Sequence, residues 1–212
     1  MASGKIVDLR REHQEAYAPQ EEPRIFRAGR TWCIDLTGRG DPGGPDFQDA
    51  VSTLFGLLRR LRRAAQKAGR DFKMMPLECV YWSARKGIDP TAVPAKSWHW
   101  RLLIRVPFFV NVQDLALASA DLEDRREATL ARAAKIEWLQ EGLCAQALHV
   151  GPYDAEPATL QRMRAVAESQ GLALIGPRHE IYLSDPKRTA PERLKTLIRM
   201  PVARSPAARL RA

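Results

Sequence analysis

The feature that most constrains this chain is an order of secondary structure that occurs twice. In residues 31–106, a run with strand composition is followed by a Gly- and Pro-rich turn, an amphipathic helix and two further strands. In residues 141–202, a strand, a Gly-Pro turn, a helix and two strands follow in the same order. Each unit buries one sheet face under its helix, so the pattern predicts an α+β fold of duplicated β-α-β-β units with antiparallel sheets.

In the first unit, the spacing of apolar residues changes clearly from that of a strand to that of a helix. We expect strands at 31–37, 77–83 and 98–106, and a helix at 47–69 that ends at a glycine. The apolar residues of that helix recur at helical spacing: Val51, Leu54, Phe55, Leu58, Leu61, Ala65 and Ala68. The second unit predicts strands at 141–150, 180–184 and 194–202 and a helix at 159–170.

Short echoes support a duplication. Arg105-Val106-Pro107 and Arg199-Met200-Pro201 end the last strand of each unit, and Glu78-Cys79-Val80-Tyr81 resembles Glu180-Ile181-Tyr182. Two such units related by a pseudo-twofold axis place their helices on one face. Their opposite, concave faces then meet at a central ligand cleft.

The flanking segments complete the predicted organisation. We expect an N-terminal arm at 1–29, one small-molecule-binding domain at 30–202 and a disordered basic tail at 203–212. Within the domain, the first repeat covers about 30–107, a linking helix covers 111–132, and the second repeat covers about 136–202.

Composition excludes several classes of protein. No run approaches the roughly 18 apolar residues of a membrane span, and the first residues lack a signal-peptide core, so we expect a cytoplasmic protein without a membrane partner. The net charge of +9 concentrates at the end of the first predicted helix and in the tail. No helix-turn-helix or RNA-binding motif accompanies it, so nucleic acid is not the expected partner.

The cysteines and histidines do not form a metal or disulfide pattern. Cys33, Cys79 and Cys144 are isolated within apolar runs, which predicts buried free thiols. His149 and His179 lie on separate strands, and we expect both to be hydrogen-bonded structural residues. Because P-loop, GxGxxG, GxSxG and HExxH motifs are all missing, we expect neither a cofactor nor a metal.

Aromatic residues give the first indication of a ligand site. Trp98 and Trp100 are two residues apart and therefore share a strand face, whereas Tyr81 and Trp82 point to opposite faces. Tyr153 and Tyr182 lie in the second unit. A cleft position is favoured for the two alternating tryptophans, and a core position remains open for Trp82.

Two acidic residues occupy similar places in the repeats. Glu78 and Glu180 lie inside otherwise apolar strands, and a buried carboxylate needs a partner or a raised pKa. Such a group in an aromatic cleft is a general base or a counter-ion for a cationic ligand. The alternative is a salt bridge to an arginine such as Arg101 or Arg178.

Several segments together resemble the GyrI-like family across roughly residues 20–202. They are Pro76-Leu77-Glu78, Trp98-His99-Trp100, Glu141-Gly142-Leu143-Cys144-Ala145-Gln146, His149-Val150-Gly151-Pro152-Tyr153 and the run from His179 to Thr196. The resemblance implies the duplicated fold of the effector-binding domains of multidrug-sensing transcription activators. Two departures are Phe108-Phe109, where similar proteins tend to carry an acid, and Tyr81-Trp82, which replaces a paired-tryptophan run.

The resemblance also implies a function. Stand-alone relatives are associated with hydrolysis of cyclopropane-bearing, DNA-alkylating natural products, and other members are ligand-binding modules or gyrase inhibitors. Our hypothesis is that Glu180 activates water and Tyr153 donates a hydrogen bond, while other residues hold a flat ligand. These ligand-binding residues are Trp98, Trp100, Trp82, Tyr81, Glu78 and Tyr182.

Two other functions remain open. The first is a non-catalytic module that sequesters an amphipathic cation between Glu78 and Glu180. The second is a protein partner such as DNA gyrase, bound by the basic stretch from Arg59 to Arg70.

Overall fold

The computed structural model describes residues 6–85, 90–120, 122 and 125–205, and within them the chain forms a nine-stranded antiparallel sheet with helices. The strands are β1 Arg24–Ala28, β2 Thr31–Arg39, β3 Glu78–Ser83, β4 Trp98–Arg105, β5 Lys135–Leu139, β6 Gly142–Val150, β7 Leu172–Leu174, β8 Arg178–Tyr182 and β9 Lys195–Arg204. The α-helices are α1 Leu9–Glu12, α2 Pro45–Lys67, α3 Val112–Ala120, α4 Arg125–Ala133 and α5 Glu156–Ser169. Short 3-10 helices are η1 Gln14–Tyr17, η2 Pro90–Ala92, η3 Ala95–Ser97, η4 Tyr153–Ala155 and η5 Pro191–Arg193.

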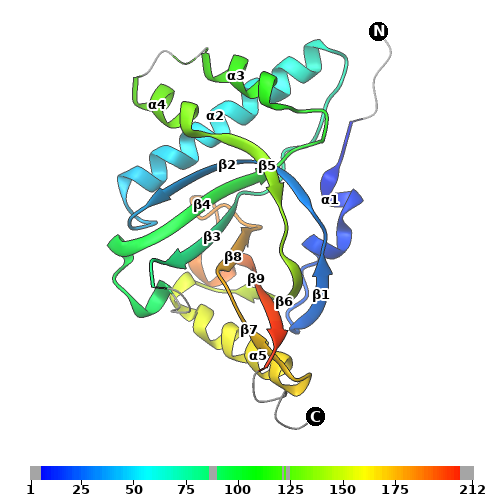
Figure 1. The fold of residues 1–212 in the computed structure, drawn as a ribbon, viewed down its shortest axis with the longest axis vertical. Coiled ribbons are helices and arrows are strands. Elements are labelled where there is room, and N and C mark those ends of the chain that lie inside the picture. The colour runs from blue at the N-terminus through cyan, green and yellow to red at the C-terminus, as the bar shows by residue number, and fades with distance from the viewer. Residues whose placement is uncertain (1–5, 86–89, 121, 123–124, 206–212) are drawn as a thin grey trace.

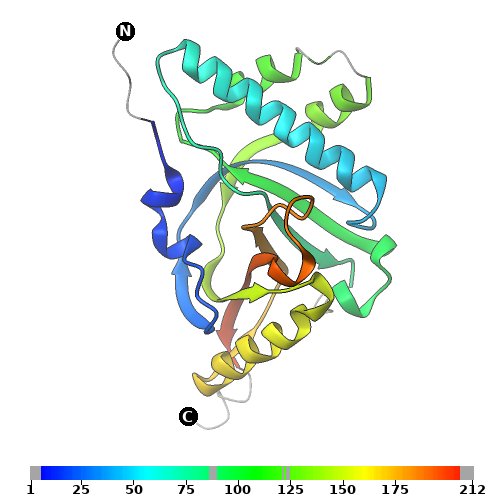
Figure 2. The ribbon, with the colours of Figure 1, turned by 180° about the vertical axis from the view of Figure 1, so that it is seen from behind.

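The strand order displays the two units side by side. The order is β1-β6-β9-β8-β3-β4-β2-β5, with β7 paired to β9. The second unit contributes β6-β9-β8 and the first contributes β3-β4-β2, so the sheet is symmetric about the central β3–β8 pair. Both long helices, α2 and α5, lie in front of the same sheet face in Figure 2. The predicted α+β fold of two β-α-β-β units with helices on one face is therefore confirmed.

A two-stranded ribbon ties the halves together. β1 pairs with β6 and β2 pairs with β5, and the two ladders are in phase: Ala28 lies opposite Gly142, and Thr31 lies opposite Leu139. Thus β1, which leads into β2 of the first unit, lies on the edge of the second unit. Likewise β5, which leads into β6 of the second unit, lies on the edge of the first unit. Gly142 has a φ of 75°, which a residue without a Cβ adopts at little cost. The ribbon makes the two units parts of one curled sheet (Figure 1).

Three expectations about the flanking and linking segments differ from the structure. The segment expected to be an N-terminal arm contains α1, η1 and β1, so it extends the sheet. The expected linking helix at 111–132 is two helices, α3 and α4, and β5 follows them. β9 continues to Arg204, two residues beyond the expected end of the domain. Residues 206–212 of the tail and 86–89 of the β3–β4 connection lie outside the described residues.

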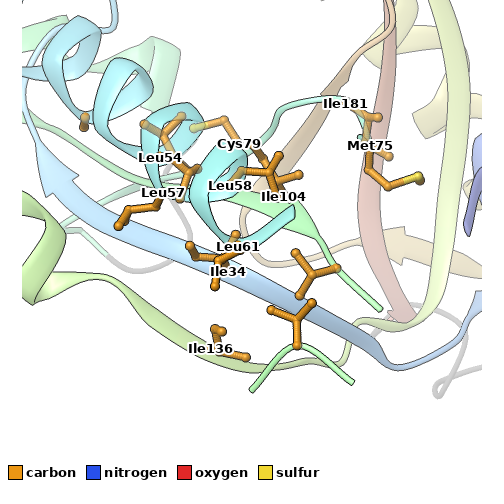
Figure 3. Close-up of a cluster of buried hydrophobic side chains, with 14 of the residues drawn as sticks. Ile34, Leu54, Leu57, Leu58, Leu61, Met75, Cys79, Ile104, Ile136 and Ile181 are labelled. Carbon is orange, nitrogen blue, oxygen red and sulfur yellow. The ribbon is translucent and has the colours of Figure 1, made fainter. Parts of the chain in front are cut away.

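The core lies between α2 and the first half of the sheet. Leu54, Leu57 and Leu58 are fully buried, and they face Cys79 and Ile104 of the sheet (Figure 3). Each fully buried leucine stabilises the fold by about 1.5–3 kcal/mol relative to an exposed one. The amphipathic spacing in the sequence therefore identified the helix face that carries the packing.

The second unit has a smaller core of the same design. Met163 and Ala167 of α5 are fully buried against Ala145, Ala147 and Ile198. The two alanines of β6 let the helix approach the sheet closely. The three cysteines are buried and free, as predicted. No helix within the described residues has the length and apolar character needed to cross a membrane.

Candidate ligand site between the two helices

The register at the centre of the sheet separates the two acids. Cys79 lies opposite Glu180, while Glu78 lies opposite Ile181. Residues directly opposite in an antiparallel pair share a face, and neighbours along a strand alternate. Because Cys79 packs with α2, Glu180 lies on the face that carries α2 and α5, which we call the helix face. Glu78 lies on the opposite face, so the expectation of equivalent positions is wrong.

A chain of buried polar contacts surrounds Glu180. Its Oε1 lies 2.9 Å from Nε of Arg178, and its Oε2 accepts a hydrogen bond of 3.0 Å from the hydroxyl of Tyr182. That hydroxyl is 2.7 Å from the hydroxyl of Tyr81. Arg178 also lies 3.3 Å from Glu156, the first residue of α5. The carboxylate is therefore fixed through both oxygens, and the predicted alternative of a salt bridge to Arg178 is what the structure has.

Aromatic rings border this cluster. The ring of Tyr153 meets that of Tyr182 edge to face at 6.0 Å, and Tyr153 is 42% exposed. Trp98 meets Tyr81 edge to face at 5.7 Å, and the guanidinium of Arg178 lies 6.0 Å from its ring. The half-exposed Tyr153 and the half-buried Trp98 thus give the buried carboxylate an aromatic margin that reaches the surface.

The turn that carries Tyr153 is held by a histidine. His149 is buried, with Nδ1 3.0 Å from the hydroxyl of Thr159 and Nε2 3.0 Å from the carbonyl of Pro152. Gly151 has a φ of 136°, which strongly favours glycine at this turn. His149 therefore links the end of β6 to α5, and it is the structural histidine that the sequence predicted.

The surroundings make Tyr153 and Tyr182 persistent hydrogen-bond donors. Burial, followed by the charge of Glu180, raises the pKa of Tyr153 to about 12. Burial and then Glu180 also raise the pKa of Tyr182 well above its ordinary value. Both hydroxyls therefore keep their protons at neutral pH.

The other two tryptophans of the expected ligand site, Trp100 and Trp82, lie in different surroundings. Trp100 shares the helix face but is 3% exposed and packs edge to face on Phe47 at 5.2 Å, so it is a core residue at the border of the cluster. Trp82 lies on the opposite face, where its ring stacks on His99 at 5.6 Å. The three tryptophans expected to hold one flat ligand therefore do not share a face, because the pleat sends Trp82 away from Trp98.

The opposite face carries a closed network around Glu78. Tyr17 donates a hydrogen bond of 2.5 Å to Glu78, and His179 lies 3.0 Å from Glu78 and 2.8 Å from Glu141. Arg199 donates to Glu141 at 2.6 Å and to the carbonyl of Ala16 at 2.8 Å. The network thus holds the N-terminal segment onto the sheet.

Charges within this network shift one another's pKa values. Burial opposes protonation of His179, but Glu141 and Glu78 raise its pKa to about 9. Burial alone would raise the pKa of Glu141, but His179 and Arg199 lower it to about 2. Burial also opposes ionisation of Glu78, yet His179 lowers its pKa below the ordinary value. The network is therefore charged at neutral pH, and His179 is structural, as predicted.

Sequence reasoning missed the residues that arrange both networks. On the helix face the missed residue is Glu156, which pairs with Arg178, and on the opposite face the missed residues are Tyr17, Glu141 and Arg199. One signal was present: Glu180 is two residues from Tyr182, but Glu78 is three residues from Tyr81. In strands, the first spacing places acid and tyrosine on one face and the second places them on opposite faces. Among the described residues, no three His, Cys, Asp or Glu side chains group to hold a metal ion.

Known proteins are similar to the chain over nearly its full length. Residues 128–203 match the family model of the GyrI-like small molecule binding domain. An uncharacterized conserved protein from Listeria innocua is 30% identical, with a TM-score of 0.84 over 93% of this chain and 100% of that chain. A hydrolase from Listeria innocua is 29% identical, with a TM-score of 0.82 over 94% of this chain and 100% of that chain.

A more distant likeness concerns the fold alone. The C-terminal domain of EcmrR is 12% identical, with a TM-score of 0.54 over 86% of this chain and 98% of that chain. No protein with a curated description matches the chain.

Proposed function

The chain belongs to the GyrI-like family of small-molecule-binding domains, and from that premise we propose that it binds a planar small molecule beside Glu180 and hydrolyses it. The substrate class we propose is a cyclopropane-bearing, DNA-alkylating compound, whose strained ring is opened by water. The product no longer alkylates DNA, so the biological role is detoxification. No cofactor takes part in this reaction.

The observation that carries the proposal is the fixed carboxylate at an aromatic margin. Arg178 and Tyr182 hold the two oxygens of Glu180, while Tyr153 lies beside Tyr182 with its ring partly exposed. A carboxylate held in this way presents a defined lone pair to a water molecule, and no reorganisation is needed during the reaction. The similar hydrolase from Listeria innocua supports hydrolysis as the reaction type.

The reaction needs one proton acceptor and one hydrogen-bond donor. Water attacks the exposed carbon of a cyclopropane conjugated to a dienone, the ring carbon–carbon bond breaks, and its electron pair passes to the carbonyl oxygen. Glu180 accepts the proton of the attacking water, and that proton finally reaches the oxygen, which becomes a phenol. Tyr153, whose pKa of about 12 keeps its hydroxyl protonated, donates a hydrogen bond to that oxygen. The substrate gains one molecule of water.

Mass spectrometry of a duocarmycin analogue incubated with the purified protein tests the proposal. We expect a product heavier by one water, and Glu180→Gln should slow its formation by about 100-fold or more, because general-base catalysis contributes about 10²–10⁴-fold. Tyr153→Phe should slow it by about 10²-fold, as does removal of one oxyanion donor. Glu168→Gln, on the exposed surface of α5, is the matched control and should retain full activity.

The opposite result has a definite meaning. If Glu180→Gln and Tyr153→Phe both turn over the compound at the wild-type rate, these residues do not perform the reaction. If wild type leaves the compound unchanged, the proposal of hydrolysis is wrong.

A second candidate function is binding of a lipophilic cation without chemistry. The rings of Tyr153, Tyr182 and Trp98 near Glu180 favour it, because aromatic faces and a carboxylate attract a cation. Arg178 opposes it, because an arginine already lies 2.9 Å from Glu180 and a ligand cation has to compete with that ion pair. Equilibrium dialysis of tetraphenylphosphonium, followed by mass analysis, decides between hydrolysis and binding alone. Saturable binding that is lost in Glu180→Gln supports the second candidate, provided that neither this cation nor the duocarmycin analogue is chemically changed.

A further inference from the structure

A pocket of about 350 Å³ lies at the outer end of the first unit. Its walls come from the end of β2, the first turn of α2 and the helix α4, and Trp100 of β4 also lines it. The Glu180 cluster contributes no residue to this pocket. The residues that the inference uses are Gly38, Asp46, Trp100, Arg126 and Leu130.

The indole of Trp100 is the unusual element of the wall. Its Nε1 is buried and has no hydrogen-bond partner among the residues that the structure describes. Trp98 and Trp32 differ, since their indoles donate to the carbonyls of Val93 at 3.0 Å and Val110 at 2.8 Å. A buried donor without an acceptor costs about 1–3 kcal/mol, so a ligand that supplies an acceptor recovers free energy here.

The indole rests on a residue without a side chain. A Cβ built at Gly38 would lie 2.1 Å from Cη2 of Trp100, so the ring lies directly on the β2 backbone. Packing alone therefore holds the ring in the pocket wall, and no hydrogen bond of the described residues occupies its N–H. Leu130, which is half-buried on α4, supplies an apolar wall.

Two of the three charged side chains that line the pocket already pair with each other, and the third, Arg39, is exposed at the end of β2. Arg126 of α4 lies 2.9 Å from Asp46 and 2.6 Å from Asp49, both in the first turns of α2. This pairing holds α4 against α2 as the outer wall of the pocket. A charged ligand that reaches Asp46 or Arg126 would have to disrupt this ion pair, so this wall of the pocket favours a neutral one.

We propose that this pocket is a second ligand site, which binds a neutral, planar molecule carrying a carbonyl-type acceptor that receives a hydrogen bond from Trp100. The site is separate from the hydrolysis proposed at Glu180. Three features select this kind of ligand: the apolar wall, the ion pair between Arg126 and Asp46, and the unpartnered indole N–H of Trp100.

Protein NMR with indan-1-one as the probe tests the proposal. The indole N–H resonance of Trp100 is identified by its loss in Trp100→Phe. We expect indan-1-one to move this resonance downfield, and indane, which has the same rings without the carbonyl, to bind without that shift. Trp100→Phe should weaken indan-1-one binding by about 3- to 10-fold, the effect of one hydrogen bond, and leave indane binding within about twofold.

A pocket-filling variant makes the test independent of the tryptophan. Leu130→Trp should abolish binding of both probes, whereas Tyr153→Phe should leave both unchanged. The proposal is overturned if neither probe binds at millimolar concentration, if the Trp100 resonance does not respond to indan-1-one, or if binding persists in Leu130→Trp. None of these results depends on whether the protein hydrolyses a cyclopropane.

Discussion

The two faces at the centre of the sheet carry similar charged residues and are closed in different ways. On the opposite face, Glu78 and His179 are each 1% exposed beneath the N-terminal segment, which Tyr17 and Arg199 hold in place. On the helix face, Glu180 is 4% exposed, but 42% of Tyr153 beside the cluster is in contact with solvent. What covers a buried acid thus decides whether it is sealed in or lies beside a solvent-exposed ring.

The largest effect should come from breaking the closed network. Arg199→Met leaves Glu141 buried without its 2.6 Å partner, and we expect the free energy of unfolding to fall by about 3–5 kcal/mol. Urea unfolding measures it, with Arg204→Met at an exposed position of the same strand as control, expected to change stability by less than about 0.5 kcal/mol. Equal losses of unfolding free energy in the two variants would show that the network contributes no more to stability than an exposed residue does.

The closed network should also set the pH dependence of stability. The pKa of His179 rises from 6.5 to about 9, so its contribution is complete below about pH 6.5 and is lost as the pH rises through 9. The pKa of Glu141 falls from 4.5 to about 2, so its contribution is complete above about pH 4.5 and is lost as the pH falls through 2. Stability should therefore be greatest between about pH 4.5 and 6.5. Urea unfolding from pH 5 to 10 tests this, and a constant free energy from pH 6.5 to 9.5 would contradict it.

A pair of tyrosine substitutions compares the two faces directly, and we expect it to have the smallest effects on stability. Tyr17→Phe removes a 2.5 Å hydrogen bond to Glu78 in the closed network, and we expect a loss of about 1.5–3 kcal/mol. Tyr182→Phe removes a 3.0 Å hydrogen bond to Glu180, beside the half-exposed ring of Tyr153, and we expect a loss of about 0.5–1.5 kcal/mol. Thermal unfolding of both variants compares them; a larger loss in Tyr182→Phe would reverse the assignment of the two faces.

Long elements were predictable because their periods extend over many residues. The helix expected at 47–69 is α2, at Pro45–Lys67, and each expected strand of the two units overlaps an observed one. β1, β5 and β7 were missed because the first two have five residues and the third has three, and each pairs with a strand far away in sequence. Short strands of this kind are stabilised by their partners rather than by their own composition.

The candidate site was predictable only in part. Glu180, Tyr182, Tyr81 and Trp98 do gather on one face, next to Tyr153. The face itself was not predicted, since the cleft was expected opposite the helices and the cluster lies between them. Arg178 and Glu156 come from β8 and the start of α5, and no local pattern links an arginine on a strand to an acid 22 residues earlier.

The sequence by itself determined the α+β class, the repeated order of elements and several residues that bury α2, such as Leu54, Leu58 and Leu61, because hydrophobic periods of 2 and 3.6 are local properties of a chain. Only the tertiary structure decided that Glu180 belongs to the helix face and Glu78 to a closed network, that Trp82 lies away from Trp98, and that the N-terminal segment covers the sheet. The physical reason is register: a shift of one residue moves a side chain to the other face, and packing between distant segments sets that shift.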